Sequence, residues 1–253
     1  MTPDATPASP SAGPQSVDRA LELLDVIAQA PDPVSAKALA RRAGCALSTV
    51  YHLLGPLTAR GLVVRTSAGY ALGHRIPTLH QDFQRQLHLG RDTREVLLRL
   101  RDATGAQAYF STFRDGGIAI VDSTAAHADR PTPFVVGPES RAHATAHGKA
   151  LLAALPRAVR QRYLTEHGLP RLTEHTITGR DRFEAELRRV RRGGVAVSVA
   201  ESDPGYACLA VPLPAPGLPG QARALSVSLP ARAYQRHHAR LVQALTRAAR
   251  DVH

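Results

Sequence analysis

Gly44 separates two short stretches of helical periodicity, and this arrangement limits the fold of the N-terminal part of the chain more than any other feature. Before it, Ser35 is suited to cap a helix over AKALARRAG, because a serine hydroxyl accepts a hydrogen bond from a free amide of the first turn. Glycine adopts the positive φ of a tight turn without a steric penalty. We therefore expect a helix, a turn at Gly44 and a second helix in quick succession.

The helix after this turn is predicted from about Leu47 to Gly61, with Pro56 inside it as a possible bend. Its inward-facing apolar positions are Val50, Leu53, Leu54 and Leu57. The β-prone runs LVVRT and GYALG follow, joined by Ser-Ala, and predict a small hairpin. An earlier helix is expected after Ser16, a good N-cap, and ends before Pro31. Three helices and a hairpin resemble a winged helix-turn-helix, in which one helix enters the major groove of DNA.

The distribution of charge favours the same interpretation. From Pro33 to Ile76 the chain has six basic residues and no Asp or Glu, within a formal net charge of +11 for the whole chain. The predicted DNA contacts are Ser48, Thr49, Tyr51 and His52 near the start of the recognition helix, with Arg41, Arg42 and Arg65 meeting the phosphate backbone. The alternative for this segment is a helical packing module with a basic face.

The rest of the chain alternates between helices and strands. Strands are expected at AQAYFSTF, GIAIVDS, FVVG, VAVSVA, ACLAVPL and ARALSVSL, and helices around residues 96–103, 146–155, 157–167, 181–194 and 231–252. This mixture predicts an α+β fold in which helices flank a largely antiparallel sheet. The expected division is a disordered tail at 1–15, a DNA-binding domain at 16–76, a linker helix at 77–90 that follows Pro77, and a second domain at 91–253.

The segment HATAHGKA contains two histidines, His143 and His147, whose spacing would place them on one face of a helix, as in metal-dependent hydrolases. It lacks the Glu that follows the first His in HExxH, and no third ligand is evident nearby. Gly148 and Lys149 lack the upstream glycine and the following Ser or Thr of a phosphate-binding loop. The sequence therefore predicts no catalytic residue, no metal and no cofactor.

These motifs resemble those of one family. SVDRALELLDVIAQAP, ALARRAGCALSTVYHLLGPLTARGLVV and YALG are similar to the N-terminal domain of IclR-family transcriptional regulators. HATAHGKALLAALP, LPRLTEHTIT, ESDPGYACLAVPL and ALSVSLP continue the resemblance in the same order. The resemblance implies a winged helix-turn-helix joined by a helix to a GAF-like effector-binding domain, in a homodimer or a dimer of dimers. It implies a regulator, more often a repressor than an activator, that binds an imperfect palindrome in double-stranded DNA and responds to a small, anionic metabolite.

The resemblance also implies an effector pocket. Its residues would be Ala146, His147, Gly148, Ser198, Cys208, Ser226 and Ser228. Alternation with apolar neighbours directs Ser226 and Ser228 to one sheet face, where two hydroxyls can bind a carboxylate or a carbonyl. Ser198 stands where family members often have an acidic residue, and Arg141 and Ala142 stand where proline and an apolar residue are common. The pocket remains suited to an anion, although no particular ligand follows.

The remaining features are less specific. Cys45 and Cys208 are far apart and are interpreted as buried free thiols in a reducing compartment. No apolar run is long enough to span a membrane, and the N-terminal segment lacks the features of a secretion signal, so a cytoplasmic location is expected. Two alternatives stay open: a DNA-binding protein whose C-terminal domain serves only for assembly, and an enzyme or metal-binding protein that uses His143 and His147.

Overall fold

The computed structural model describes residues 15–86, 92–125, 141–215 and 220–252. The chain divides into two compact units, residues 1–87 and 88–253, and each has its own apolar core. The predicted tail at residues 1–14 and the predicted strand FVVG lie outside the described residues. No helix of the described part is both long and apolar enough to cross a membrane.

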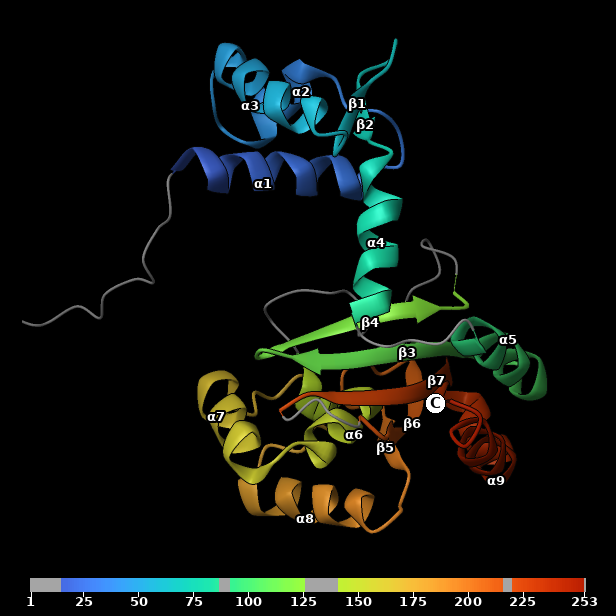
Figure 1. The fold of residues 1–253 in the computed structure, drawn as a ribbon. Helices are drawn as coiled ribbons and strands as arrows, with labels where there is room; N and C mark the ends of the chain where they lie inside the picture. Colours follow the sequence, from blue (N-terminus) through green and yellow to red (C-terminus); the bar gives the residue numbers. More distant parts are fainter. Residues whose placement is uncertain (1–14, 87–91, 126–140, 216–219, 253) are drawn as a thin grey trace, which may run out of the picture. The chain divides into compact units, whose positions relative to one another are not determined.

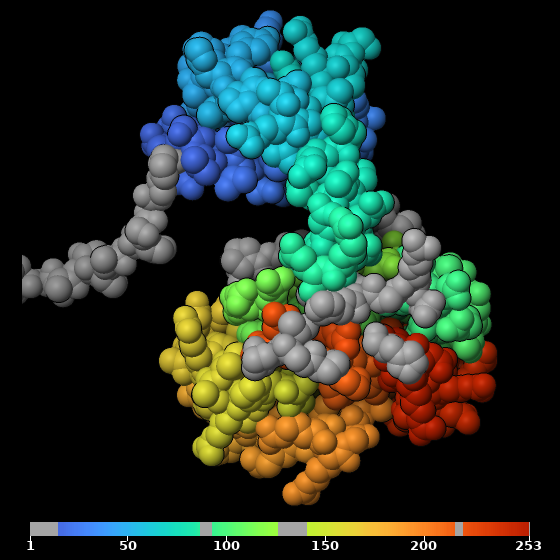
Figure 2. Space-filling model, in the orientation of Figure 1, coloured from blue at the N-terminus to red at the C-terminus, as the bar shows by residue number. Residues whose placement is uncertain are grey.

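The N-terminal unit contains the three helices and the hairpin that the sequence predicts, and Figure 2 shows it as a close-packed body in blue to cyan. Its elements are α1 (Gln15–Gln29), α2 (Ala36–Arg42), α3 (Leu47–Ala59), β1 (Val63–Arg65), β2 (Tyr70–Leu72) and α4 (Arg75–Gln86). The two strands pair in antiparallel register, and Val34 adds an isolated bridge to Tyr70. This arrangement is a helix-turn-helix followed by a wing.

Local chemistry sets the turn between α2 and α3. The Ser35 hydroxyl accepts a hydrogen bond from the Ala38 amide at 3.2 Å, as expected for an N-cap. Gly44 has a φ of +58°, and the Cys45 amide donates to the Ala40 carbonyl at 3.1 Å. Gly44 therefore provides the left-handed turn that brings the two helices together.

Helix α1 differs from the prediction in its start, and part of its apolar surface is exposed. It begins at Gln15, so Ser16 lies within the first turn instead of capping it. The buried residues of α1 are Leu23 and Ile27, whereas Val17 and Leu21 are 51% and 54% exposed. Helix α1 therefore carries apolar side chains that the core of its own unit does not bury.

Helix α4 also begins earlier than the sequence indicated. It starts at Arg75, and Pro77 is its third residue. Proline is tolerated there because the amides of the first turn have no acceptor within the helix. The helix ends at Gln86, and the predicted continuation through residues 87–90 lies outside the described part of the chain.

The second unit is an antiparallel sheet with helices on both faces, as predicted. Its helices are α5 (Asp92–Thr104), the short 3₁₀ turn η3 (Ala142–Ala144), α6 (Ala146–Ala154), α7 (Arg157–His167), α8 (Arg180–Arg191) and α9 (Ala231–Ala248). Its strands are β3 (Gln107–Arg114), β4 (Gly117–Ser123), β5 (Ala196–Val199), β6 (Tyr206–Leu213) and β7 (Ala222–Pro230), in the order β4-β3-β7-β6-β5. The terminal helix stops at Ala248, short of the predicted residue 252.

The two faces of this sheet are covered by different helices. Helices α6, α7 and α8 pack against the face that carries Tyr109, Cys208 and Ala224. Helices α5 and α9 lie side by side against the other face (Figure 1), where they contact β3, β6 and β7. Because side chains alternate along a strand, the residues of the α6 face are fixed by the strand register.

Candidate functional site

Polar side chains gather near the start of α3, in a unit that has no acidic residue between Pro33 and Ile76. Ser48 and His52 are exposed, Tyr51 is 49% exposed, and Thr49 is half-buried. Val50 and Leu54 of the same helix are buried in the core, so the polar residues lie on its outer part. This pattern presents hydroxyl, phenol and imidazole groups to solvent.

The structure brings Tyr51 close to the wing. A cavity of about 410 Å³ between α3 and β1–β2 is lined by Tyr51, Gly55, Thr58 and Arg65, among others. The sequence prediction did not include Gly55 or Thr58, although their spacing of four and seven residues from Tyr51 places them on one helix face. Arg65 is exposed on β1.

Arg41 and Arg42 lie in the last turn of α2, and both are exposed. Within the described part of the chain, neither they nor Arg65 form an ion pair. Their charges are therefore available to a polyanion, because no neighbouring carboxylate neutralises them.

The HATAHGKA segment is not one continuous helix. His143 lies in η3, Thr145 is extended with φ −118° and ψ 145°, and α6 begins only at Ala146. The Thr145 hydroxyl accepts a hydrogen bond from the Gly148 amide at 3.2 Å and so caps α6. The expected placement of His143 and His147 on one helix face is therefore wrong, because the N-cap interrupts the helix between them.

The two histidines have separate surroundings. His143 Nε2 is 2.8 Å from the Pro170 carbonyl, and its pKa is lowered mainly by burial. Burial lowers the pKa of His147 to about 4, so its imidazole is neutral at neutral pH. Among the described residues, no group of three or more His, Cys, Asp or Glu side chains is arranged to hold a metal ion.

Strand register brings the predicted pocket residues of the sheet together. Ser198, Cys208 and Ser228 are opposite one another on β5, β6 and β7, and Ser226 lies one step further along the same face of β7. The Cys208 thiol donates to the Ser228 hydroxyl at 3.4 Å, and burial raises the pKa of this thiol to about 11. Cys208 is therefore a protonated donor and not a nucleophile.

The hydroxyls of this face differ in their partners. Ser198 donates to the Ala144 carbonyl at 2.6 Å and so holds η3 against β5. Ser226 is fully buried, and its hydroxyl has no hydrogen-bond partner among the described residues. A buried hydroxyl without a partner loses about 1–3 kcal/mol of hydration, so it marks a place where a bound group would be stabilised.

Lys149, from the Gly-Lys pair, is 1% exposed and forms a buried ion pair. Its ammonium donates to Glu201 Oε1 at 2.5 Å and to the Val197 carbonyl at 2.9 Å. Thr173 and Thr176 donate to the backbone carbonyl of Glu201 and fix the loop that presents it. The sequence alone did not indicate this pairing, and the structure places the Glu201 carboxylate on the Lys149 ammonium.

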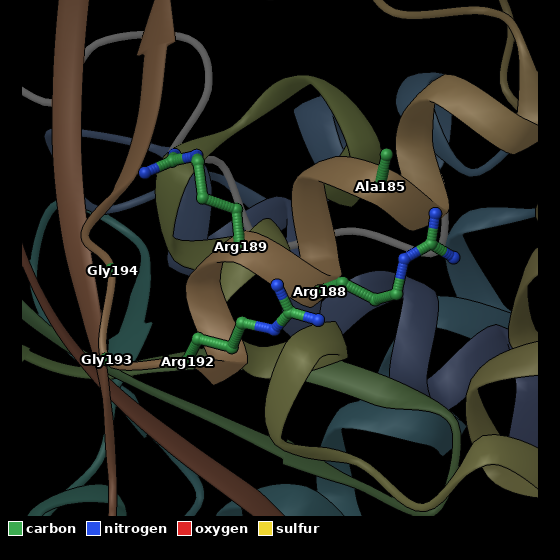
Figure 3. Close-up of a pocket in the computed structure, with 6 residues that line it drawn as sticks. All are labelled: Ala185, Arg188, Arg189, Arg192, Gly193 and Gly194. Atoms are coloured by element: carbon green, nitrogen blue, oxygen red, sulfur yellow. The ribbon is translucent and has the colours of Figure 1, made fainter.

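Positive charge also collects at the end of α8, away from the predicted pocket residues. A cavity of about 490 Å³ is lined by Ala185, Arg188, Arg189 and Arg192 together with two glycines (Figure 3). Figure 3 shows the Arg189 side chain pointing away from those of Arg188 and Arg192, and Arg189 is bound to Glu186. Arginines in the last turn of a helix complement its negative end, which explains this cluster without a ligand.

Comparisons with known proteins match both units to the same family. Residues 16–67 match the IclR helix-turn-helix domain, and residues 82–253 match the family described as the C-terminal part of the bacterial transcriptional regulator IclR. The HTH-type transcriptional regulator BhcR of Paracoccus denitrificans is 32% identical over 209 residues, which cover 81% of this chain and 74% of that protein. The HTH-type transcriptional regulator Rv1719 of Mycobacterium tuberculosis is 31% identical over 93% of this chain and 90% of its own length.

Solved structures show the same fold. An IclR transcriptional regulator from Alicyclobacillus acidocaldarius superposes with a TM-score of 0.71 at 25% identity, over 95% of this chain and 98% of that one. An IclR homolog from Microbacterium hydrocarbonoxydans, complexed with 4-hydroxybenzoate, superposes with a TM-score of 0.72 at 20% identity, over 93% and 96% of the two chains. At this lower identity the second likeness concerns the fold alone.

Proposed function

This chain belongs to the IclR family of bacterial transcriptional regulators, and we propose that it represses transcription from an imperfect palindrome until a small organic anion binds its C-terminal unit. The observation that carries the proposal is the row of exposed polar residues near the start of α3 in a segment with basic but no acidic residues. In helix-turn-helix proteins this part of the second helix contacts base edges.

In this proposal, base contacts and backbone contacts come from different elements. Ser48, Thr49, Tyr51 and His52 meet base edges or phosphates, while Arg41, Arg42 and Arg65 bind phosphates on either side. Gly55 and Thr58 join Tyr51 and Arg65 in lining the cavity between α3 and the wing. The phosphate contacts set the register, and the α3 contacts set the sequence preference.

We further infer that the regulator acts as a homodimer, with pairing of dimers as the next level of assembly. Val17 and Leu21 are more than half exposed and are spaced four residues apart on α1, and Leu79 of α4 is 42% exposed. Large apolar side chains that are exposed on a helix favour a second copy of the chain as partner. Two recognition helices then address half-sites about 34 Å apart, or a multiple of that distance.

The proposed effector site is the α6 face of the sheet, with Ala146, His147 and Gly148 at the start of α6 and with Ser198, Cys208, Ser226 and Ser228 on the strands. The unpaired Ser226 hydroxyl and the first amides of α6 favour an acceptor-rich group such as a carboxylate. Lys149 contributes little net charge because Glu201 neutralises it. Arg141, which is exposed beside η3, is a cation that can attract an anion.

The DNA proposal is tested with labelled duplex from upstream of the regulator's own gene, in the presence of excess nonspecific competitor. The wild-type protein is compared with Ser48→Ala/His52→Ala and with Ser67→Ala, a control at an exposed serine in the wing turn. We expect a protected palindrome that the double variant no longer recognises and the control retains. Equal, salt-sensitive binding by all three proteins would reject base reading by α3, because contacts to phosphates alone behave in this way.

The effector proposal is tested on the same operator complex. Small carboxylates, with 4-hydroxybenzoate among them, are screened for release of the wild-type protein from the operator. A ligand must bind the conformation that binds the operator and the conformation that does not with different affinity, because only then does it shift the equilibrium between them. A carboxylate that binds the protein on the α6 face but leaves operator affinity unchanged would favour the alternative in which this unit serves only for assembly.

A further inference from the structure

A second cavity lies on the opposite face of the sheet, between α5 and α9. Its volume is about 500 Å³, and residues of both helices line it. The two helices are neighbours in the structure (Figure 1), and the Arg240 guanidinium joins them by donating to the Ala103 carbonyl at 2.6 Å. The volume falls within the range of about 300–1,000 Å³ that is common for small-molecule sites.

The rim of this cavity carries positive charge that no described neighbour neutralises well. Arg99 extends from α5, and Arg240 and Arg247 extend from α9. The contact of Arg99 with Glu95 is 3.4 Å long, and both side chains are more than half exposed, so it contributes little. Asp251 also lines the cavity, yet none of the ion pairs among the described residues joins it to these arginines.

The floor of the cavity is apolar. Val96 and Leu100 of α5, which are 1% and 2% exposed, line it together with Ala244 and Ala248 of α9. The cluster at the end of α8 differs in this respect, because Ala185 and two glycines are its uncharged lining and Arg189 is already paired there. The α5–α9 groove thus combines an apolar floor with arginines that come from both helices.

The composition of this groove fits a small molecule better than a protein. The seven large hydrophobic residues that are exposed in the described part of the chain all lie in the N-terminal unit, and none lies on α5 or α9. A second copy placed face to face on the groove would bring arginines against arginines. Arginine forms paired hydrogen bonds with a carboxylate, which suits an anion seated above an apolar floor.

We propose that the groove between α5 and α9 is a second ligand site, separate from the α6 face, which binds an organic carboxylate with an apolar body. The carboxylate lies between Arg99 and Arg247, with Arg240 holding the two helices together. The apolar body lies on Ala244 and Ala248 of α9, which line the cavity and are only partly buried. Helix α5 begins six residues after the end of α4, so a ligand that ties α5 to α9 acts on the first element after the DNA-binding unit.

The site is tested by isothermal titration calorimetry of the full-length protein with 1-naphthoate, and with 1-naphthalenemethanol as the uncharged analogue. The test variant is Arg99→Gln/Arg247→Gln, whose side chains are both exposed, so the fold is retained. The matched control is Arg232→Gln/Arg236→Gln, which removes two exposed charges of α9 outside the groove. We expect the test variant to bind 1-naphthoate about tenfold more weakly or worse, because hydrogen bonds between charged groups are lost.

The control variant should bind 1-naphthoate as the wild type does, and the alcohol should bind the wild type at least about tenfold more weakly than the carboxylate. Equal affinity of the test variant and the wild type would overturn the proposal. So would loss of 1-naphthoate binding in Ser226→Val with the test variant unaffected, because the probe would then occupy the α6 face. Sedimentation velocity without ligand supplies a further check, since dissociation of an oligomer by the test variant alone would make the groove a protein interface.

Discussion

Burial lowers the pKa of His147 in α6, and the effect can be measured as a dependence of stability on pH. Its pKa is lowered from 6.5 to about 4 by desolvation, so the unfolded chain binds more protons than the folded chain between these values. The free energy of unfolding should therefore fall as the pH falls from 6.5 toward 4, by up to about 1.4 kcal/mol per pH unit from this group. Urea unfolding at several pH values measures the slope.

Other groups titrate in the same range, so a matched pair of variants isolates the contribution of His147. His147→Gln should have a shallower slope than the wild type, whereas His175→Gln, at an exposed histidine, should follow the wild type. Identical slopes for His147→Gln and the wild type would contradict the assignment of a depressed pKa to His147.

The Lys149–Glu201 pair gives the second prediction for individual residues. Both side chains are at least nine-tenths buried, so Glu201→Ala leaves an ammonium in the interior with one carbonyl partner. We expect a loss of about 3–5 kcal/mol in the free energy of unfolding. The double variant Lys149→Met/Glu201→Leu removes both charges and should be markedly more stable than Glu201→Ala in the same urea titration. A double variant as unstable as the single one would show that packing and not charge sets the cost.

Two helical glycines lead to opposite predictions at the level of elements. A Cβ at Gly148 would lie 2.3 Å from the Cα and the carbonyl oxygen of Ala142, so this glycine permits η3 to pack on α6. At Gly55 in α3 a Cβ would have nothing within 4 Å. Gly148→Ala should therefore lower the free energy of unfolding by about 1–3 kcal/mol, and Gly55→Ala should raise it by up to about 1 kcal/mol. Thermal and urea unfolding of both variants measure the two signs.

The elements themselves were largely predictable because their signals are local. The Ser35 cap, the turn at Gly44 and the alternation around Ser226 each depend on a few neighbouring residues, and the structure contains all three features. The interruption at Thr145 was not predictable from spacing. Its cause is a hydrogen bond from the Gly148 amide to the threonine side chain, together with the close packing of Ala142. Such tertiary constraints override helical periodicity.

The partners of buried polar groups could not be predicted from the sequence either. Lys149 and Glu201 are 52 residues apart, and their pairing depends on the loop that Thr173 and Thr176 hold in place. The groove between α5 and α9 joins segments that are further apart still. Spacing along the chain carries no information about such contacts, whereas it predicted that Ser226 and Ser228 share one face of the sheet.

For the whole molecule, the exposed apolar stripe on α1 has a consequence for assembly. Helix α1 has more apolar residues than the core of its unit buries. Leu23 and Ile27 are its buried residues, whereas Val17 and Leu21 are exposed to solvent. Burial of these side chains in a dimer interface would stabilise the dimer by about 25 cal/mol for each Å² of apolar surface removed from water. We predict that Val17→Ser/Leu21→Ser shifts the full-length protein toward monomer in sedimentation velocity at micromolar concentration.

The same variant should bind its operator more weakly. Two separate monomers then bind the two half-sites, and the high effective concentration of the second DNA-binding unit in a dimer is lost. The control is Leu72→Ser, which removes a 40% exposed leucine from the wing and should leave the sedimentation coefficient unchanged. If the α1 variant sediments as the wild type does, the dimer contact lies in another part of the chain. If both variants sediment as monomers, general loss of surface hydrophobicity and not the α1 stripe governs assembly.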